Sequence, residues 1–450
     1  MQNIFVIGAG RASTALIDYL LNHAPKENWK IKVGDFSFDL AQQRVYGNPN
    51  GKAIKFDIND KSQRESEIGK ADLIVSFLPP YMHTIVAKEC LKYKSHLVTA
   101  SYLTVEMQEL HIKVKKAGLI FLNEMGLDPG LDHMDSMKII TRIKNEGGKI
   151  VSYKSYGSGL ISPDSRQNPW KYKFTWSPMN VVLAGQTGAQ YIEDNKLKIV
   201  PYNRIFSNPK KITIPGYGDF EAYPNRDSLI YREKYGLVNI PNFLRATLRK
   251  PGYSEAWDQL IKLGLTDNSY IIDGSEDLTY RDWIISYLPE VNGKKPEKAL
   301  ADFLEIPEDG KLMKKLLWLG ILSNEKIPLK NATPAKILLN LLEERWKMNM
   351  HDTDLVILQT EIKYELDGKL KKITSTMTCE GKNNHHTAMA KTVGLPAAIG
   401  AKLILNKKIK ERGVIIPIKE DIYEPVLKEL KKFKIDFTEK EIEIRKNGAA

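Results

Sequence analysis

Cysteine is scarce, since the chain of 450 residues contains only Cys90 and Cys379. Two cysteines supply neither a disulfide framework nor a zinc site with several thiolate ligands, so a reducing, cytoplasmic setting is expected. Long apolar runs are also missing, because none approaches the roughly 20 residues of a membrane-spanning helix. A strand pattern follows Met1 almost at once and leaves no room for a signal or transit peptide. The sequence therefore predicts a soluble protein that does not enter a membrane.

Internal repeats and low-complexity segments are absent as well, and the length predicts two or three domains. Lys and Arg number 67 against 55 Asp and Glu, which gives a net charge of +12. These basic residues are scattered, whereas a nucleic-acid-binding surface gathers them on one element. The charge therefore favours small anionic substrates and not nucleic acid.

The first 127 residues alternate between strand and helix patterns, beginning with the strand "NIFVIGAG", the helix "RASTALIDYLLNH" and the strand "WKIKVGD". Further strand patterns in "GKAIKFDIND", "ADLIVSFLPP" and "SHLVTASY" continue the alternation. Alternation of this kind predicts a mostly parallel sheet with helices on both faces, as in a dinucleotide-binding domain.

The turn after the first strand carries Gly8 and Gly10 in the positions of the pattern G-x-G-x-x-G, with Ser13 in place of the third glycine. Gly8 allows a tight turn, Gly10 lets the backbone approach a pyrophosphate, and the helix that begins near Arg11 offers its N-terminal amides. The alternative is a structural turn without a nucleotide. Because the pattern lies between a strand and a helix, we expect a dinucleotide site.

Asp35 closes the second strand, where an acid can accept hydrogen bonds from both ribose hydroxyls of the adenosine. A carboxylate repels a 2′-phosphate, and "FSFD" after it offers no arginine, so NAD is expected in preference to NADP. The alternative is that Asp35 only caps the next helix. Asp57 follows the third strand and is expected at the adenine edge, although a turn aspartate has the same pattern.

The stretch "NEMGLDPGLDHMDSM" gathers Glu124, Asp128, Asp132, His133 and Asp135. Pro129 and Gly130 interrupt any helix between the first two aspartates, and no further ligand follows at a suitable spacing, so no metal is expected. Acids after the glycine fit the first turn of a helix. Asp128 instead lies on a turn at the end of the last predicted parallel strand. There a carboxylate can bind a substrate ammonium group or assist proton transfer.

The pattern changes from residue 147, where longer alternating strands predict an antiparallel sheet. Residues 227–350 show mostly helical spacing, and residues 352–381 read as a hairpin. Arg226 stands in the turn "YPNRDS", and Arg245 and Arg249 stand in "RATLRKPGY". Guanidinium groups bind carboxylates through paired hydrogen bonds, which suits a polycarboxylate substrate. The alternative is that these arginines are ordinary surface or helix-end residues.

Six stretches together resemble the saccharopine dehydrogenases of the glutamate-forming type: "VTASYLT", "NEMGLDPGLDHM", "NPWKYKFTWSP", "AYPNRDS", "LRATLR" and "AMAKTVGLPAA". The resemblance implies an α/β fold with a variant Rossmann domain, an α/β substrate and dimerisation domain, and an inserted helical domain. It also implies a homodimer. The implied domains are residues 1–127 with about 390–415, residues 128–226 with about 351–389 and 416–450, and residues 227–350.

The implied reaction is oxidation of the secondary amine of saccharopine by hydride transfer, then hydrolysis of the imine to glutamate and 2-aminoadipate 6-semialdehyde. With NAD as the expected cofactor, the resemblance favours lysine degradation. Asp128 is the expected catalytic residue. The resemblance implies that the substrate contacts Ser101, Tyr102, Asp128, Arg226, Thr247, Leu248 and Arg249. The expected cofactor-binding residues are Gly8, Gly10, Arg11, Ala12, Asp35, Asp57, Leu78, Ser101, Leu127 and Asp128.

One departure from the family is Gly157 in "YGSGLISPD", where relatives place a cysteine near the substrate. That cysteine is therefore not required for chemistry in this chain. Two other functions are compatible with the fold. One is a reductase that joins an amine to an aldehyde, such as a carboxynorspermidine synthase. The other is a non-catalytic nucleotide-binding protein. The presence of both "YPNRDS" and "TLR" argues against the first, and the intact site stretches argue against the second.

Overall fold

The computed structural model describes residues 1–289 and 293–444. Contacts divide the chain into two compact units. The first unit contains residues 1–159, 233–238 and the described residues from 353 onward, and the second contains residues 160–232 and 239–352. The three-domain division expected from the sequence stays a prediction.

A seven-stranded parallel sheet forms the N-terminal part of the first unit, as the alternating patterns predict. Its order is β15-β6-β5-β4-β1-β2-β3. The strands are β1 (Gln2–Ile7), β2 (Trp29–Asp35), β3 (Gly51–Lys55), β4 (Leu73–Ser76), β5 (His96–Thr99), β6 (Ile120–Leu122) and β15 (Gly413–Ile415). Every pairing in it is parallel, and β15 brings the C-terminal part of the chain to the edge beside β6.

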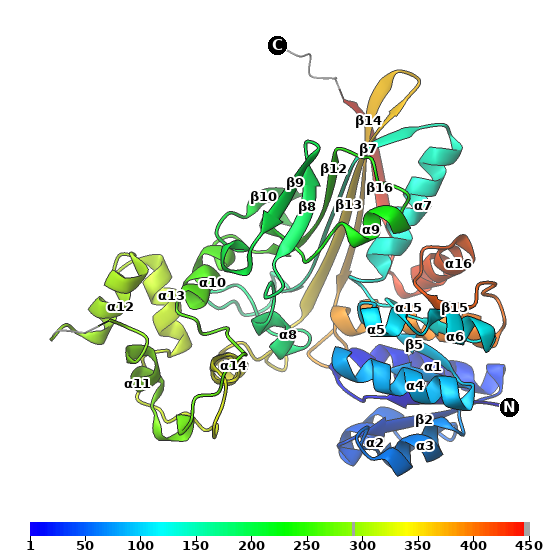
Figure 1. Ribbon diagram of the computed structural model, residues 1–450, viewed down its shortest axis with the longest axis horizontal. Coiled ribbons are helices and arrows are strands. Elements are labelled where there is room, and N and C mark those ends of the chain that lie inside the picture. Colours follow the sequence, from blue (N-terminus) through cyan, green and yellow to red (C-terminus); the bar gives the residue numbers. More distant parts are fainter. Residues whose placement is uncertain (290–292, 445–450) are drawn as a thin grey trace. The chain divides into compact units, whose positions relative to one another are not determined.

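Helices cover both faces of this sheet (Figure 1). One face buries Val86 and Val114, from α4 and α6, against Phe5 and Ile7 of β1. On the other side α15 packs on α1 so closely that a Cβ on Gly394 would lie 2.9 Å from the Leu16 nitrogen. The helices of this unit are α1 (Thr14–Glu27), α2 (Phe38–Val45), α3 (Lys61–Ile68), α4 (His83–Tyr93), α5 (Val105–Gln108), α6 (His111–Lys116), α7 (Leu131–Asn145), α15 (Ala388–Leu405) and α16 (Glu420–Leu430).

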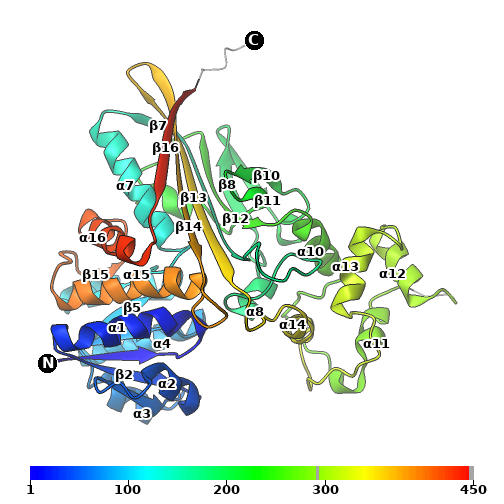
Figure 2. The same ribbon diagram turned by 180° about the vertical axis from the view of Figure 1, so that it is seen from behind.

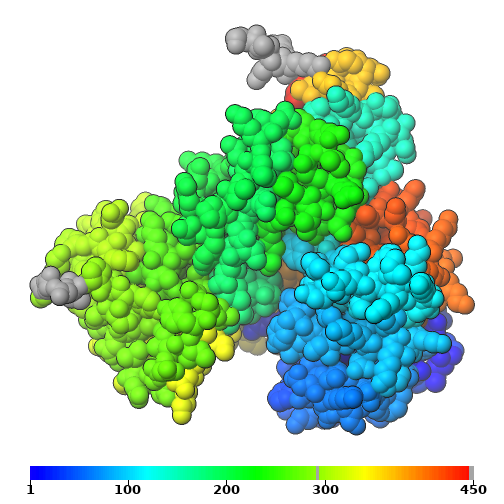
Figure 3. Space-filling view, viewed as in Figure 1, coloured from blue at the N-terminus to red at the C-terminus, as the bar shows by residue number. Residues whose placement is uncertain are grey.

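Among the described residues, α15 is the one helix whose length and composition would allow it to cross a membrane. Its apolar window is 83% buried inside the fold, as in the core helix of a soluble protein. In space-filling form, the C-terminal residues coloured orange lie directly against the N-terminal residues coloured blue and cyan (Figure 3). The two ends of the chain therefore build one unit.

An antiparallel sheet completes the first unit with β7 (Lys149–Ile161), β13 (Asp354–Leu366), β14 (Lys369–Glu380) and β16 (Thr438–Ile444). β13 and β14 form the hairpin expected at residues 352–381, with Leu366 opposite Lys369 at its turn. β16 runs antiparallel along the other side of β14, as Figure 2 shows from behind. Helix α7 packs against β13 and carries the buried side chain of Asp135.

Asp135 → Asn is expected to stabilise the protein in alkaline solution. Burial raises the pKa of Asp135 to about 7, and its Oδ1 accepts a 2.9 Å hydrogen bond from the Ser375 hydroxyl. The folded state therefore binds this proton more tightly than the unfolded chain, and stability falls as the pH rises from about 4 through 7. Asparagine keeps the acceptor without a charge. Urea unfolding at pH 8 should show a gain of ~1–3 kcal/mol, which should vanish at pH 4. A gain of equal size at both pH values would contradict this account.

The second unit has a three-stranded antiparallel run β10-β11-β12, with β8 pairing with β12 and β9. Its strands are β8 (Ala189–Glu193), β9 (Lys196–Val200), β10 (Lys210–Ile214), β11 (Gly218–Pro224) and β12 (Asn242–Arg249). β12 lies inside the stretch that the sequence predicts as mostly helical. Its residues alternate between two faces, as a strand requires, and the surrounding helical patterns obscured that alternation.

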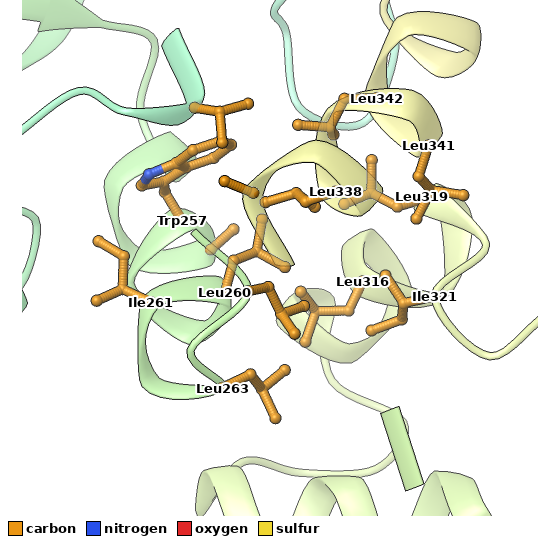
Figure 4. Packing of buried hydrophobic residues seen from close by; sticks show 14 of the residues in the cluster. Trp257, Leu260, Ile261, Leu263, Leu316, Leu319, Ile321, Leu338, Leu341 and Leu342 are labelled. Atoms are coloured by element: carbon orange, nitrogen blue, oxygen red, sulfur yellow. The ribbon is translucent and has the colours of Figure 1, made fainter. Parts of the chain in front are cut away.

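The helices of the second unit pack around one apolar core. Leu260, Leu316 and Leu338, from three different helices, point toward one another in Figure 4. Trp257 and Trp346 extend the core and are fully buried. The helices are α8 (Pro178–Val182), α10 (Tyr253–Lys262), α11 (Tyr280–Ile285), α12 (Pro296–Leu304), α13 (Lys311–Leu319) and α14 (Pro334–Arg345), while the residues of α9 (Ile230–Lys234) are divided between the two units.

Candidate active site

The glycine turn after β1 has the geometry of a dinucleotide-binding loop. Gly8 has φ +104°, and a Cβ there would lie 2.8 Å from the Phe77 carbonyl oxygen, so only glycine fits. At Gly10 an added Cβ would meet nothing within 4 Å. The backbone at Gly10 is therefore open on the side where a side chain would stand. The 3₁₀ turn Arg11–Ser13 and α1 follow at once, with Ser13 buried and its hydroxyl donating to the Gly10 carbonyl oxygen.

Asp35 and Asp57, the two predicted adenosine contacts, both accept hydrogen bonds from backbone amides of the protein. Asp35 Oδ2 accepts a 2.7 Å hydrogen bond from the Ala9 amide, and its Oδ1 accepts one of 2.9 Å from the Ser37 amide. Asp57 Oδ1 accepts a 2.9 Å hydrogen bond from the Asn59 amide, as a turn aspartate does. Asp35 therefore holds the glycine turn in place by a bond that the sequence pattern does not reveal.

Asp128 follows β6 on a turn and is hydrogen-bonded to a second predicted site residue. The Tyr102 hydroxyl donates to Asp128 Oδ1 over 2.9 Å. On the neighbouring strand β7, a Cβ added to Gly157 would lie 3.3 Å from Asp128 Oδ2. The backbone at Gly157 therefore faces this carboxylate. Tyr102 and Asp128 form a pair that can hold and pass a proton.

The turn that carries Asp128 is fixed by contacts among its own residues. The Gly126 amide donates to the Pro129 carbonyl oxygen over 3.0 Å, and the Gly130 amide donates to Asp132 Oδ1 over 2.7 Å. Asp132 thus satisfies an amide at the start of α7, in line with the expected acid at a helix start. Leu127 is buried, whereas Asp128 is only partly covered.

Glu124 and His133 form a buried support beneath this turn that the sequence did not reveal. His133 Nε2 lies 2.8 Å from Glu124 Oε2, and the exposed fractions of the two side chains are 0% and 2%. The other Glu124 oxygen accepts a 2.9 Å hydrogen bond from the Leu103 amide, next to Tyr102. His133 Nδ1 bonds to the hydroxyl of Tyr235, which is 102 residues away. A partner that distant leaves no signal in local spacing.

Five residues were possible metal ligands on the sequence alone: Glu124, Asp128, Asp132, His133 and Asp135. Within residues 1–289 and 293–444, no group of three or more His, Cys, Asp or Glu side chains is arranged to hold a metal ion. Cys90 and Cys379 are buried, free thiols. The contacts of Glu124, Asp132 and His133 instead support the turn between Tyr102 and α7.

The other predicted substrate contacts lie in the second unit. Arg226 is exposed in the turn after β11, with φ +54°. Thr247 and Arg249 are two residues apart on β12 and therefore share a face of the strand, whereas Leu248 points to the opposite face and is fully buried. Leu248 can thus reach a ligand only through its backbone. Arg245, also suspected from the sequence, is 1% exposed and lies over the Tyr231 ring at 4.5 Å.

Aromatic rings hold Arg249 in a fixed place. Its guanidinium carbon lies 4.9 Å from the Tyr172 ring centre and 5.2 Å from that of Tyr253. One of its terminal nitrogens donates to the Leu248 carbonyl oxygen over 2.8 Å. Cation–π contacts with buried rings hold a positive charge in one position. The guanidinium group of Arg249 is therefore fixed in place.

Comparisons with known proteins identify the family of the chain. The family model described as the saccharopine dehydrogenase C-terminal domain matches residues 126–435, and the one described as the saccharopine dehydrogenase NADP binding domain matches residues 4–122. The chain belongs to the saccharopine dehydrogenase family. Members of this family are oxidoreductases, and the resemblance inferred from the sequence is confirmed.

Individual relatives span the full length of the chain. A saccharopine dehydrogenase [NADP(+), L-glutamate-forming] from Pyricularia oryzae is 32% identical over 98% of this chain and 99% of its own length. The alpha-aminoadipic semialdehyde synthase of Arabidopsis thaliana is also 32% identical over 98% of this chain, but the chain spans only 45% of that longer protein.

Solved structures confirm the predicted fold class. The apo saccharopine dehydrogenase (L-Glu forming) of Saccharomyces cerevisiae superposes with a TM-score of 0.86 and 29% identity, covering 98% of this chain and all of that one. A homospermidine synthase from Legionella pneumophila has a TM-score of 0.56 at 11% identity, which shows a shared fold alone.

The preference for NAD inferred from Asp35 is contradicted by these relatives. Fungal members from Pyricularia oryzae, Saccharomyces cerevisiae and Schizosaccharomyces pombe are all named as NADP(+) enzymes. The matching description of residues 4–122 also names NADP. The physical reason is that the Asp35 carboxylate accepts hydrogen bonds from the Ala9 and Ser37 amides. Because Asp35 has this role within the protein, its presence does not distinguish a site for NAD from a site for NADP.

Proposed function

We propose that this protein oxidises saccharopine with NADP⁺ and water to L-glutamate and 2-aminoadipate 6-semialdehyde, as a step of lysine degradation. The observation that carries the proposal is the Tyr102–Asp128 pair, which follows the parallel strands on which the glycine loop stands. The names of the relatives support both products: one group is named glutamate-forming, and the other is named a synthase of alpha-aminoadipic semialdehyde. A homodimeric, cytoplasmic enzyme is part of the same proposal.

The residues of the glycine loop fit a dinucleotide. The open side of Gly10 and the amides at Arg11 and Ala12 would hold its pyrophosphate, while Gly8 keeps the turn tight. When bound, the nicotinamide supplies the hydride acceptor. Leu78, after β4, lies beyond the carboxyl end of the parallel sheet, where dinucleotides bind in this class of fold.

Asp128 and Tyr102 are suited to the proton steps. The secondary amine of saccharopine must lose a proton before a hydride can leave the adjacent carbon. Asp128, with Tyr102 hydrogen-bonded to it, can accept that proton directly or through water. Water then adds to the imine, the carbon–nitrogen bond breaks, and the amine leaves as glutamate with a proton returned to its nitrogen. The same pair can take up and return these protons.

The carboxylates of saccharopine require cations or hydrogen-bond donors. We assign the carboxylates to Arg226, Arg249 and the Thr247 hydroxyl, because a guanidinium group matches a carboxylate in charge and geometry and a hydroxyl can donate a hydrogen bond to it. The tyrosine rings around Arg249 keep its charge in one position before the substrate arrives.

The deciding experiment incubates purified protein with saccharopine and follows the absorbance of the reduced nicotinamide with NADP⁺ and, separately, with NAD⁺. Released glutamate and lysine are measured in the same samples. Turnover with NADP⁺ that releases glutamate is the expected result. Release of lysine, or no turnover of saccharopine combined with reductive joining of an amine and an aldehyde, would overturn the proposal.

Gly10 → Ala is expected to weaken NADP⁺ binding at least ~10-fold while leaving the fold intact. Gly10 has φ −65°, which alanine adopts freely, and its Cβ would meet no protein atom within 4 Å. The added methyl group therefore obstructs only a ligand that approaches the backbone, at a cost of about 1.4 kcal/mol or more. Fluorescence titration measures the affinity. Gly118 → Ala is the control: a Cβ there also meets nothing within 4 Å, and although its φ of +71° costs some stability, the NADP⁺ affinity should stay unchanged. Equal affinities of the Gly10 variant and the unaltered protein would contradict the assigned pyrophosphate position.

A further inference from the structure

A buried histidine links the ends of two parallel strands to a predicted site residue. His83 is the first residue of α4, and its Nδ1 lies 2.9 Å from the hydroxyl of Ser76, the last residue of β4. Its Nε2 lies 2.8 Å from the Ser101 hydroxyl and 3.2 Å from that of Thr99, the last residue of β5. One imidazole thus contacts three hydroxyl groups just beyond the carboxyl ends of β4 and β5.

The imidazole is neutral in this position. His83 is 4% exposed, and burial lowers its pKa to about 4. A neutral imidazole carries one N–H donor and one acceptor nitrogen. When Nδ1 accepts from Ser76, Nε2 carries the proton and can donate to Ser101, the nearer of its two hydroxyl neighbours, and the opposite tautomer reverses both bonds. The direction of the Ser101 hydroxyl is therefore coupled to the ring of His83.

Ser101 lies next to Tyr102, so its orientation bears on the Tyr102–Asp128 pair. Its carbonyl oxygen accepts a 3.2 Å hydrogen bond from the Glu124 amide, and Tyr102 after it is the partner of Asp128. The Ser101 amide is bonded to the Thr99 hydroxyl over 3.2 Å, and that hydroxyl also touches His83. The backbone and the side chain of Ser101 are thus both tied to one buried group.

We propose that His83 is a positioning residue, which holds the Ser101 hydroxyl in the orientation that meets the nicotinamide end of the dinucleotide or the adjacent substrate. This inference rests on the function proposed above, because that function places a ligand at Ser101. His83 itself touches no ligand and acts only through Ser101.

A matched pair of substitutions separates positioning from packing. His83 → Gln places its amide where Nε2 stands and can still reach Ser101, whereas His83 → Asn places it where Nδ1 stands and reaches only Ser76. The Gln variant should retain kcat/KM for saccharopine, or the NADP⁺ dissociation constant, within ~3-fold. The Asn variant should lose ~10-fold in at least one of them, about the size of one hydrogen bond.

The second readout is a double-mutant cycle with Ser101 → Ala. If His83 acts through Ser101, His83 → Asn should have little further effect once the Ser101 hydroxyl is gone, so the two losses should not add. Thermal unfolding is measured for every variant. Additive losses in both kcat/KM and NADP⁺ affinity, or Gln and Asn variants with equal losses, would overturn the inference and leave His83 as a core residue.

Failure of this inference is distinguishable from failure of the proposed function. If the unaltered protein does not turn over saccharopine, the proposed function fails, and the same cycle is run on the NADP⁺ dissociation constant alone. Coupling between His83 and Ser101 in that constant would still support the positioning role. Additive or absent effects there would overturn it.

Discussion

Gly130 → Ala is expected to destabilise the protein by roughly 3 kcal/mol or more. Gly130 has φ +148°, and a Cβ would lie 2.1 Å from the Gly126 carbonyl oxygen and 2.4 Å from its nitrogen. Those atoms are backbone and cannot rotate away, so the turn that carries Asp128 must open. Urea unfolding measures the loss of stability, and the same sample should show a strongly reduced rate of saccharopine oxidation.

Gly147 → Ala is the matched control for that substitution. Gly147 also has a positive φ, +84°, but a Cβ there would meet nothing within 4 Å. Its loss should be limited to the cost of a left-handed backbone, ~1–2 kcal/mol, with kcat unchanged. Equal losses at the two glycines would show that the contact with Gly126 does not decide the stability of the turn.

Asp128 → Asn should lower kcat/KM for saccharopine by ~10²-fold or more, because general acid–base groups contribute effects of this size. Asparagine can still accept the Tyr102 hydroxyl through its Oδ1, so the fold and the 2.9 Å contact are preserved. What is lost is the negative charge and the ability to take up a proton. Steady-state kinetics with NADP⁺ checks the rate, while the NADP⁺ dissociation constant should change little.

Asp60 → Asn provides the control for that experiment. Asp60 caps α3 by accepting a 3.1 Å hydrogen bond from the Gln63 amide, and asparagine caps helices equally well. This variant removes one carboxylate from the same unit and should leave kcat/KM within ~2-fold. If the Asp128 variant also keeps kcat/KM within that range, Asp128 has no role in proton transfer.

The prediction of NAD from Asp35 was wrong, although the position of this residue was predicted correctly. The position of an acid at the end of the second strand was correct, since Asp35 closes β2. What the pattern could not include is the direction of its carboxylate, which accepts the Ala9 amide across 26 residues of chain. A residue type at a given spacing has several possible partners, and only the folded backbone selects one.

By itself the sequence determined the parallel sheet, the glycine turn at Gly8 and Gly10, the turn at Asp128 and the hairpin at residues 352–381. These features depend on periodicity and on residues close together in the chain, where steric and hydrogen-bonding preferences act directly. The tertiary structure alone decided the contacts of His83 with Ser76 and Ser101, and those of His133 with Glu124 and Tyr235. It also placed β15 beside β6. Such pairings form when distant segments pack, because burying a polar group is favourable only when another element supplies its partner.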